Sequence, residues 1–283
     1  MKIRRALVRV AVVLYSSAAL VLMSLPEGTP PAGAGTSAYW MFAADGGVFS
    51  FGGNPYLGSA AGQTLGAPVV AAAPSFDDAG YWMVTRSGQV FAFGNAKNEG
   101  SATAASTDPV VGLAPSGTVA GYWVAQADGT VTALGDAAKI TAEPIAGLSK
   151  PIVGITASAT GKGFWLVGAD GGVFAYGDAG YFGSTGNIKL NKSIVGIQRS
   201  PSGAGYLLVA SDGGVFVFGD AQFFGSTGAL TLNAPVVALV NDPTTPGYWL
   251  VAADGGVFSF GHAMFEGSMG GTKLNQPIVS AAT

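Results

Sequence analysis

Short apolar stretches separated by glycine-rich breaks run along most of the chain. One recurring stretch reads Tyr-Trp-Leu-Val, and the next reads Val-Phe-x-Phe, with Asp-Gly-Gly or a close variant between them. Both are rich in aromatic and β-branched residues, which predicts strands, and no segment carries an apolar period of 3.6 residues. Because successive residues of a strand point to opposite faces, these strands are apolar on both faces. We therefore expect each of them to lie between two layers.

The two stretches belong to a repeat. Its aromatic pair occurs at Tyr39-Trp40, Tyr81-Trp82, Tyr122-Trp123, Phe164-Trp165, Tyr206-Leu207 and Tyr248-Trp249, in steps of 42, 41, 42, 42 and 42 residues. Each repeat holds two further strand signals, of which Tyr181-Phe182-Gly183-Ser184 and the segment 151–155 are examples. The Asp-Gly pair between the first two strands predicts a two-residue hairpin turn. Four strands in about 42 residues match one blade of a β-propeller. The sequence predicts an all-β, six-bladed β-propeller with four-stranded blades.

The ends of the repeat region indicate how it closes. The Pro-Val/Ile-Val segment begins at Pro68, Pro109, Pro151, Ser193, Pro235 and Pro277. The unit at Tyr39 has no such segment before it, and the last copy, 277–283, has no aromatic unit after it. We expect this C-terminal strand to join the first blade and close the ring, which would hide both sheet edges. An open solenoid, the alternative, would more often show atypical capping repeats.

The N-terminal residues are typical of a targeting signal. A basic start (1–5) precedes an apolar run (10–25), a Pro/Gly cluster and the small residues Ala32-Gly33-Ala34. This order predicts a signal peptide over 1–34 and a single domain over 35–283, secreted or held at the cell surface. An uncleaved membrane anchor is the alternative, although the apolar run is shorter than the roughly 20 residues of a spanning helix.

Composition excludes several kinds of chemistry. The chain has no cysteine, which removes disulfides, thiol catalysis and Cys-ligated zinc. Removing residues 1–34 takes away four basic residues and one acidic residue and leaves a net charge of −6. No Lys/Arg cluster remains, so we expect no nucleic-acid partner. Beyond the signal segment the chain has one histidine and only two arginines, Arg86 and Arg199, which disfavours a hydrolase or lyase site in a central channel.

The repeat also resembles known families. Residues 45–59, Asp-Gly-Gly-Val-Phe-Ser-Phe-Gly-Gly-Asn-Pro-Tyr-Leu-Gly-Ser, are similar to the repeat of the regulator-of-chromosome-condensation propeller superfamily. The full unit more closely resembles a Gly-Tyr-Trp-Leu-Val-Ala-x-Asp-Gly-Gly-Val-Phe-x-Phe-Gly-Asp-Ala repeat of exported actinobacterial proteins. This resemblance covers 38–283 and implies the propeller fold, but it transfers no catalytic residue.

Two series of polar residues recur with the repeat. The first comprises the turn carboxylates Asp45, Asp128, Asp170, Asp212 and Asp254. Calcium needs about six to eight oxygen ligands at one point, and turns on separate blades do not converge, so we interpret them as turn residues and expect no metal site. The second series comprises Gly53, Asn95, Asp136, Asp178, Asp220 and His262, and we expect it at the opposite rim.

A few residues remain weak candidates for a binding site. His262 is followed four residues later by Glu266, and Asp178 and Asp220 share its rim series. Tyr56 and Phe76 are aromatics outside the repeated pair, so they are candidates for exposed anchors. No G-x-S-x-G elbow accompanies the histidine, so we assign no catalytic residue and no cofactor.

We therefore expect a monomeric, non-enzymatic binding or scaffold module outside the cytoplasm, with a protein or a cell-wall polymer as partner. The rim loops expected to hold that partner are 115–121, 158–163, 200–205 and 241–247. A carbohydrate-binding propeller with one shallow site per blade is the alternative. Residues 81–150 depart most from the repeat, either through drift or because they carry the binding surface.

Overall fold

The computed structural model of the protein describes residues 37–102, 108–140 and 142–283. These residues form 18 strands and no helix, arranged as six three-stranded antiparallel sheets. The prediction of an all-β repeat protein is confirmed. The expected signal peptide, 1–34, lies outside the described residues. Within the described ranges, no helix is present that would be long and apolar enough to cross a membrane.

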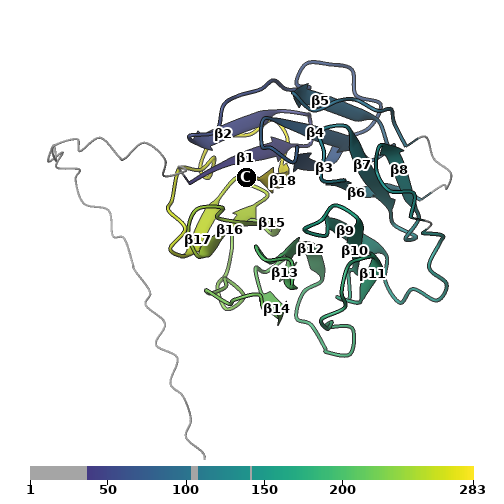
Figure 1. Cartoon of the computed structure of the whole chain (residues 1–283). Coiled ribbons are helices and arrows are strands. Elements are labelled where there is room, and N and C mark those ends of the chain that lie inside the picture. The colour runs from purple at the N-terminus through teal and green to yellow at the C-terminus, as the bar shows by residue number, and fades with distance from the viewer. Residues whose placement is uncertain (1–36, 103–107, 141) are drawn as a thin grey trace, which may run out of the picture. The chain divides into compact units, whose positions relative to one another are not determined.

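Each sheet has an inner, a middle and an outer strand around a common centre (Figure 1). The inner strands are β3 (Val69–Pro74), β6 (Val110–Pro115), β9 (Ile152–Ala157), β12 (Ile194–Arg199), β15 (Val236–Asn241) and β18 (Ile278–Ala282). The middle strands are β1 (Ala38–Ala43), β4 (Gly80–Thr85), β7 (Gly121–Gln126), β10 (Gly163–Gly168), β13 (Gly205–Ala210) and β16 (Gly247–Ala252). The outer strands are β2 (Val48–Gly52), β5 (Val90–Gly94), β8 (Val131–Gly135), β11 (Val173–Gly177), β14 (Val215–Gly219) and β17 (Val257–Gly261).

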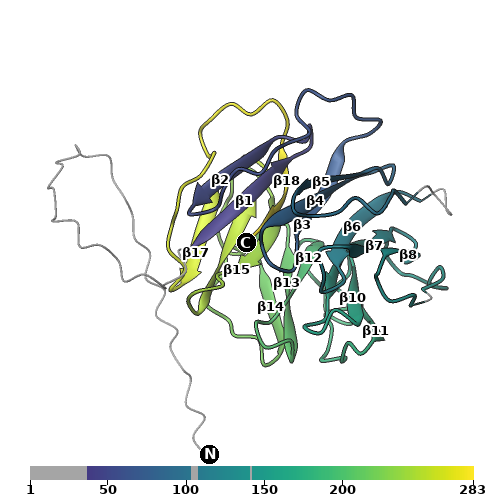
Figure 2. The ribbon, with the colours of Figure 1, turned by 45° about the horizontal axis from the view of Figure 1, so that its top comes forward.

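The first and last parts of the repeat region share one sheet, with strand order β18-β1-β2. Trp40 lies opposite Ala282 and Met41 opposite Ala281 in an antiparallel pair, and β18 is seen beside β1 in Figures 1 and 2. The predicted pairing of the C-terminal strand with the first repeat is confirmed. Each inner strand also contacts the next one in order, and β18 contacts both β15 and β3.

The middle strands form the core. All six are buried at every position, which confirms the prediction that they lie between two layers. Aromatic rings of neighbouring sheets are in contact, with centroids 4.9–5.7 Å apart, in the pairs Trp40–Tyr81, Trp82–Tyr122, Trp123–Phe164, Trp165–Tyr206 and Trp249–Tyr39. The outer strands are only partly buried, so the same prediction is wrong for them: they lie at the periphery, with less of the chain outside them.

The hairpin turn between middle and outer strands differs from the predicted two-residue form. Phe42 pairs with Val48, the Ala43 amide donates to the Gly47 carbonyl, and Gly46 has φ +81°. This is a longer loop with glycine at the left-handed position, a common hairpin geometry. The Asp45 carboxylate accepts the Gly47 amide at 3.0 Å. Asp128, Asp170, Asp212 and Asp254 do the same for the amide two residues on, so the interpretation of this series as turn residues is confirmed.

The fourth predicted strand is not a strand in the described residues. Its place in the chain is taken by what we call the outer segments, which among the described residues are 53–60, 95–102, 136–140 with Ala142, 178–185, 220–227 and 262–269. Their main chains make few ladder bonds, for example Ala60 N–H to Gly46 O at 3.0 Å. Side chains hold them instead: five tryptophan Nε1 groups donate to carbonyls of their own sheet's outer segment at 2.6–2.9 Å. Five tyrosine hydroxyls donate to glycine carbonyls of the neighbouring sheet's outer segment at 2.5–2.6 Å.

Candidate functional site

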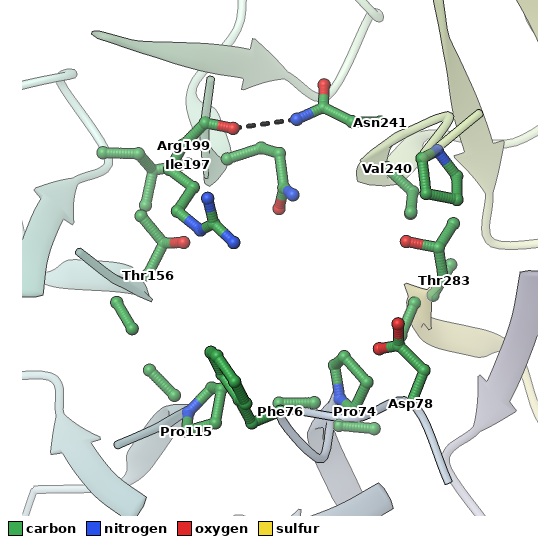
Figure 3. Close-up of a pocket in the computed structure, with 18 of the residues that line it drawn as sticks. Pro74, Phe76, Asp78, Pro115, Thr156, Ile197, Arg199, Val240, Asn241 and Thr283 are labelled. Carbon is green, nitrogen blue, oxygen red and sulfur yellow. Dashed lines mark hydrogen bonds between the residues drawn. The ribbon is translucent and has the colours of Figure 1, made fainter. Parts of the chain in front are cut away.

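A pocket of about 420 Å³ lies where the inner strands end and lead into the middle strands. We call it the mouth pocket, and Figure 3 shows it. Six of its lining residues occupy the same place in the six repeats, at or just after the end of the inner strand: Pro74, Pro115, Ala157, Arg199, Asn241 and Thr283. Five of these lie opposite the first aromatic residue of the middle strand. The six repeats therefore share this backbone position at the mouth of the pocket but differ in the side chain that they place there.

The mouth pocket contains an arginine and a carboxylate on different walls. Arg199 ends β12, its guanidinium points into the pocket, and its carbonyl accepts a hydrogen bond from Asn241 Nδ2 at 2.8 Å (Figure 3). Asp78 lies in the loop between β3 and β4, across the pocket from Arg199. Within the described parts of the chain, neither side chain is paired with an opposite charge or a hydrogen-bond partner. Both charged groups are therefore available to a ligand.

The surroundings of Asp78 change its acidity. Asp78 is exposed at the edge of the pocket. The pocket walls still desolvate its carboxyl group and raise its pKa, the charge of Asp77 raises that pKa further, and Arg199 acts to lower it. The influence of Arg199 means that the two charges interact through the pocket.

Most side chains around the cavity next to the mouth pocket are apolar. This cavity of about 140 Å³ is lined by the inner strands, including Val70, Val111, Val153, Val195, Val237 and Val279. Each of these valines falls at the register shift of its inner strand, and a bulge of this kind re-aims a side chain. Small residues such as Gly112, Gly154 and Gly196 follow. The charged side chains that line these two cavities all belong to the mouth pocket.

One residue predicted from the sequence lines the mouth pocket: Phe76, which is 63% exposed and extends into its opening (Figure 3). Three of the four predicted rim loops also contribute, through Pro115, Ser200 and Asn241. The divergent residues 81–150 add only Leu113, Ala114 and Pro115. The charged residues Asp78, Arg199 and Asp242 of the pocket therefore lie outside the segment that departs most from the repeat.

The other predicted site residues lie apart from the pocket and from one another. Asp178 accepts the Thr160 hydroxyl, and Asp220 accepts the hydroxyls of Ser202 and Ser200. These bonds hold the pKa of both carboxyl groups below its ordinary value. Each carboxylate is thereby engaged within its own repeat.

His262 and Glu266 do not form a pair in the described residues. His262 is exposed, and its main-chain N–H donates to the Pro246 carbonyl at 2.9 Å. Glu266 is half-buried in the outer segment beside Tyr39, and its charge acts to raise the pKa of that phenol. Tyr56 is 61% exposed on the outer segment of the first repeat.

Tyr56 belongs to a series that the sequence reading missed. Exposed aromatic residues occupy the same place in four outer segments: Tyr56, Tyr181, Phe223 and Phe265, with exposed fractions of 54–61%. Asn98 and Lys139 stand there in the second and third repeats. Superposing the repeats would have shown this series, and would also have shown that Arg199 and Asn241 replace proline or alanine.

The comparisons with known proteins assign the chain to no family. No protein-family model matches the chain, and no curated protein matches it.

Proposed function

We propose that residues 35–283 form a closed six-bladed β-propeller that works outside the cytoplasm as a non-enzymatic binding module for a protein or cell-wall partner. Closure is supported by the β18–β1 pairing, by the contact of β18 with β3, and by the Trp249–Tyr39 ring contact between the last and first repeats. In each blade the outer segment takes the place of the fourth strand, held by tryptophan and tyrosine side chains.

The observation that carries the binding function is the mouth pocket. Its volume falls in the range of about 300–1,000 Å³ that is typical of ligand sites, and it presents an aromatic ring, a guanidinium and a carboxylate without partners. Binding is favoured over catalysis because the channel is lined mainly by Val, Ala and Gly. The only histidine, His262, lies outside the pocket.

Site-specific crosslinking on the native cell envelope tests this proposal. A photoreactive phenylalanine analogue incorporated at Phe76 should capture an envelope component. The same analogue at Asn275, an exposed position before β18 that does not line the mouth pocket, is the control. A product specific to position 76 supports the proposal, and identical products or none from the two positions would overturn it.

A carbohydrate-binding role has one observation in its favour, the series of exposed aromatic residues on four outer segments. Such rings stack on sugars, and one per blade would give repeated shallow sites. A pull-down on purified cell wall with the full chain, compared with a Tyr56→Ala/Tyr181→Ala variant, tests this role. Loss of retention in the variant supports it, and equal retention contradicts it.

A further inference from the structure

Three charged side chains line the mouth pocket: Arg199, Asp78 and Asp242. The Asp242 carboxylate is engaged, since it accepts the hydroxyls of Ser37, Thr244 and Thr245, so the two groups left for a ligand are of opposite sign. Arg199 reaches into the pocket from β12, and Asp78 faces it from the β3–β4 loop (Figure 3). A simple anion would leave Asp78 unpaired beside it, and a simple cation would do the same to Arg199. A ligand that carries both charges satisfies both residues at once, because charge-assisted hydrogen bonds are the stronger ones.

Each residue suits one end of such a ligand. The guanidinium of arginine presents a planar fork of donors that matches a carboxylate. A carboxylate such as Asp78 accepts hydrogen bonds only, which suits the three donors of an ammonium group. The backbone near Arg199 is fixed by the Asn241 hydrogen bond to its carbonyl.

The loop that carries Asp78 is also held in place. Asp78 has φ +55°, and its N–H donates to the Ser75 carbonyl at 3.0 Å. Its neighbour Asp77 is engaged elsewhere, since it accepts the Ser75 hydroxyl at 2.8 Å and Asn95 Nδ2 at 2.6 Å. Asp77 does not line the pocket, whereas Asp78 does. The loop therefore presents one carboxylate to the mouth.

We propose that the mouth pocket binds a short peptide with free ends, its ammonium group at Asp78 and its carboxylate at Arg199, with Phe76 covering the apolar part between them. This inference rests on the proposed function and names its ligand class. Two or three extended residues span about 7–10 Å, comparable with the edge of a cube of the pocket's volume. The ligand then carries one charge for each of the two groups, Asp78 and Arg199, that have no partner in the described residues.

Calorimetric titration of the full chain with trialanine, N-acetyl-trialanine and trialanine amide tests the inference. Trialanine should bind saturably. Blocking either end should weaken binding about tenfold or more, the effect of losing one charged hydrogen bond. Because these comparisons use the unaltered chain, they do not depend on how any variant folds.

Two variants assign each end to its residue. Arg199→Gln should bind trialanine and its amide equally while still preferring a free ammonium group. Asp78→Asn should show the opposite, and asparagine tolerates the positive φ at this position. Arg86→Gln changes the one other arginine of residues 35–283, which lies in the β4–β5 turn, and should leave all three affinities unchanged.

The outcomes separate this inference from the function on which it rests. If trialanine does not bind, or if both blocked peptides bind as well as it does, the peptide assignment is wrong. If crosslinking at position 76 still captures an envelope component in that case, the binding function stands without it. If neither peptide binding nor position-specific crosslinking occurs, both proposals are overturned.

Discussion

The contact between the first and last repeats can be tested with a single hydroxyl group. Tyr39 donates a 2.5 Å hydrogen bond to the Gly267 carbonyl of the last repeat, and its ring lies 4.9 Å from that of Trp249. Tyr81 makes the same 2.5 Å bond to the Gly58 carbonyl between the second and first repeats. The change Tyr39→Phe removes the bond at the closing interface, and Tyr81→Phe removes it at an ordinary one.

The two changes should cost nearly the same free energy of unfolding. A typical intramolecular hydrogen bond contributes about 0.5–1.5 kcal/mol net, and leaving a partly buried carbonyl without its donor adds to this. We expect a loss of about 1–2 kcal/mol for each variant. For a domain of this size that lowers the melting temperature by about 2–4 °C per kcal/mol. The ring itself should stay in place, because Phe164 occupies the equivalent position and packs 5.3 Å from Trp123.

Urea denaturation followed by tryptophan fluorescence measures both losses. Tyr181→Phe serves as the control, because its exposed hydroxyl makes only a 3.3 Å bond to Ser184, and it should change stability by less than about 0.5 kcal/mol. If Tyr81→Phe is destabilising while Tyr39→Phe behaves like the control, the first and last repeats do not form an interface in solution. That result would refute the closed ring.

Three further predictions concern protons and packing. Burial raises the pKa of Tyr39 and Tyr81 to about 12. The stability that their neutral hydroxyl groups contribute is therefore complete below pH 10 and is lost as the pH rises toward 12. Ultraviolet absorbance will report the ionisation, and the urea midpoint at each pH will report the loss of stability. The Thr160 hydroxyl lowers the pKa of Asp178, so the free energy of unfolding should fall as the pH drops below about 4. In the Asp178→Asn variant, the urea midpoint should depend less on pH over this range. Gly171→Ala should destabilise the protein by about 1–3 kcal/mol more than Gly62→Ala, as measured by thermal unfolding. Both glycines have φ near +80°, but only the Cβ added at position 171 would meet a neighbouring atom, Thr185 Oγ1.

The period and the apolar pattern were sufficient to predict the repeat, the all-β class and the pairing of the last strand with the first repeat. They succeeded because the middle strands are buried on both faces, which the Tyr-Trp-Leu-Val stretches record directly. The pattern could not show that the outer segments make few ladder bonds. The donors that hold those segments are side chains such as Trp40 Nε1 and Tyr81 Oη, which lie 15 and 23 residues away in sequence, and local strand propensity contains no information about them.

The site was less predictable. Phe76 could be selected because it departs from the repeated aromatic pair, and it does line the mouth pocket. Asp78 and Arg199 lie about three repeats apart in sequence, and only the arrangement of the sheets around a common centre brings both to one pocket. The positive φ of Asp78 also depends on the Ser75 turn, which has no distinct sequence signal.

The position that holds Arg199 explains why such a fold would concentrate its specific chemistry at the mouth. Its backbone is constrained, because in five repeats the equivalent residue pairs with the first aromatic residue of the middle strand. The side chain of Arg199 is not constrained in this way, because it faces the open pocket rather than a neighbouring sheet. Hydroxyl–carboxylate pairs such as Thr160–Asp178 recur around the rim because they shape loops, whereas an arginine occurs at only one of the six equivalent positions. In the proposed ring, one such group would define one binding site and one ligand orientation, in contrast to the six equal sites that a strictly repeated surface would offer.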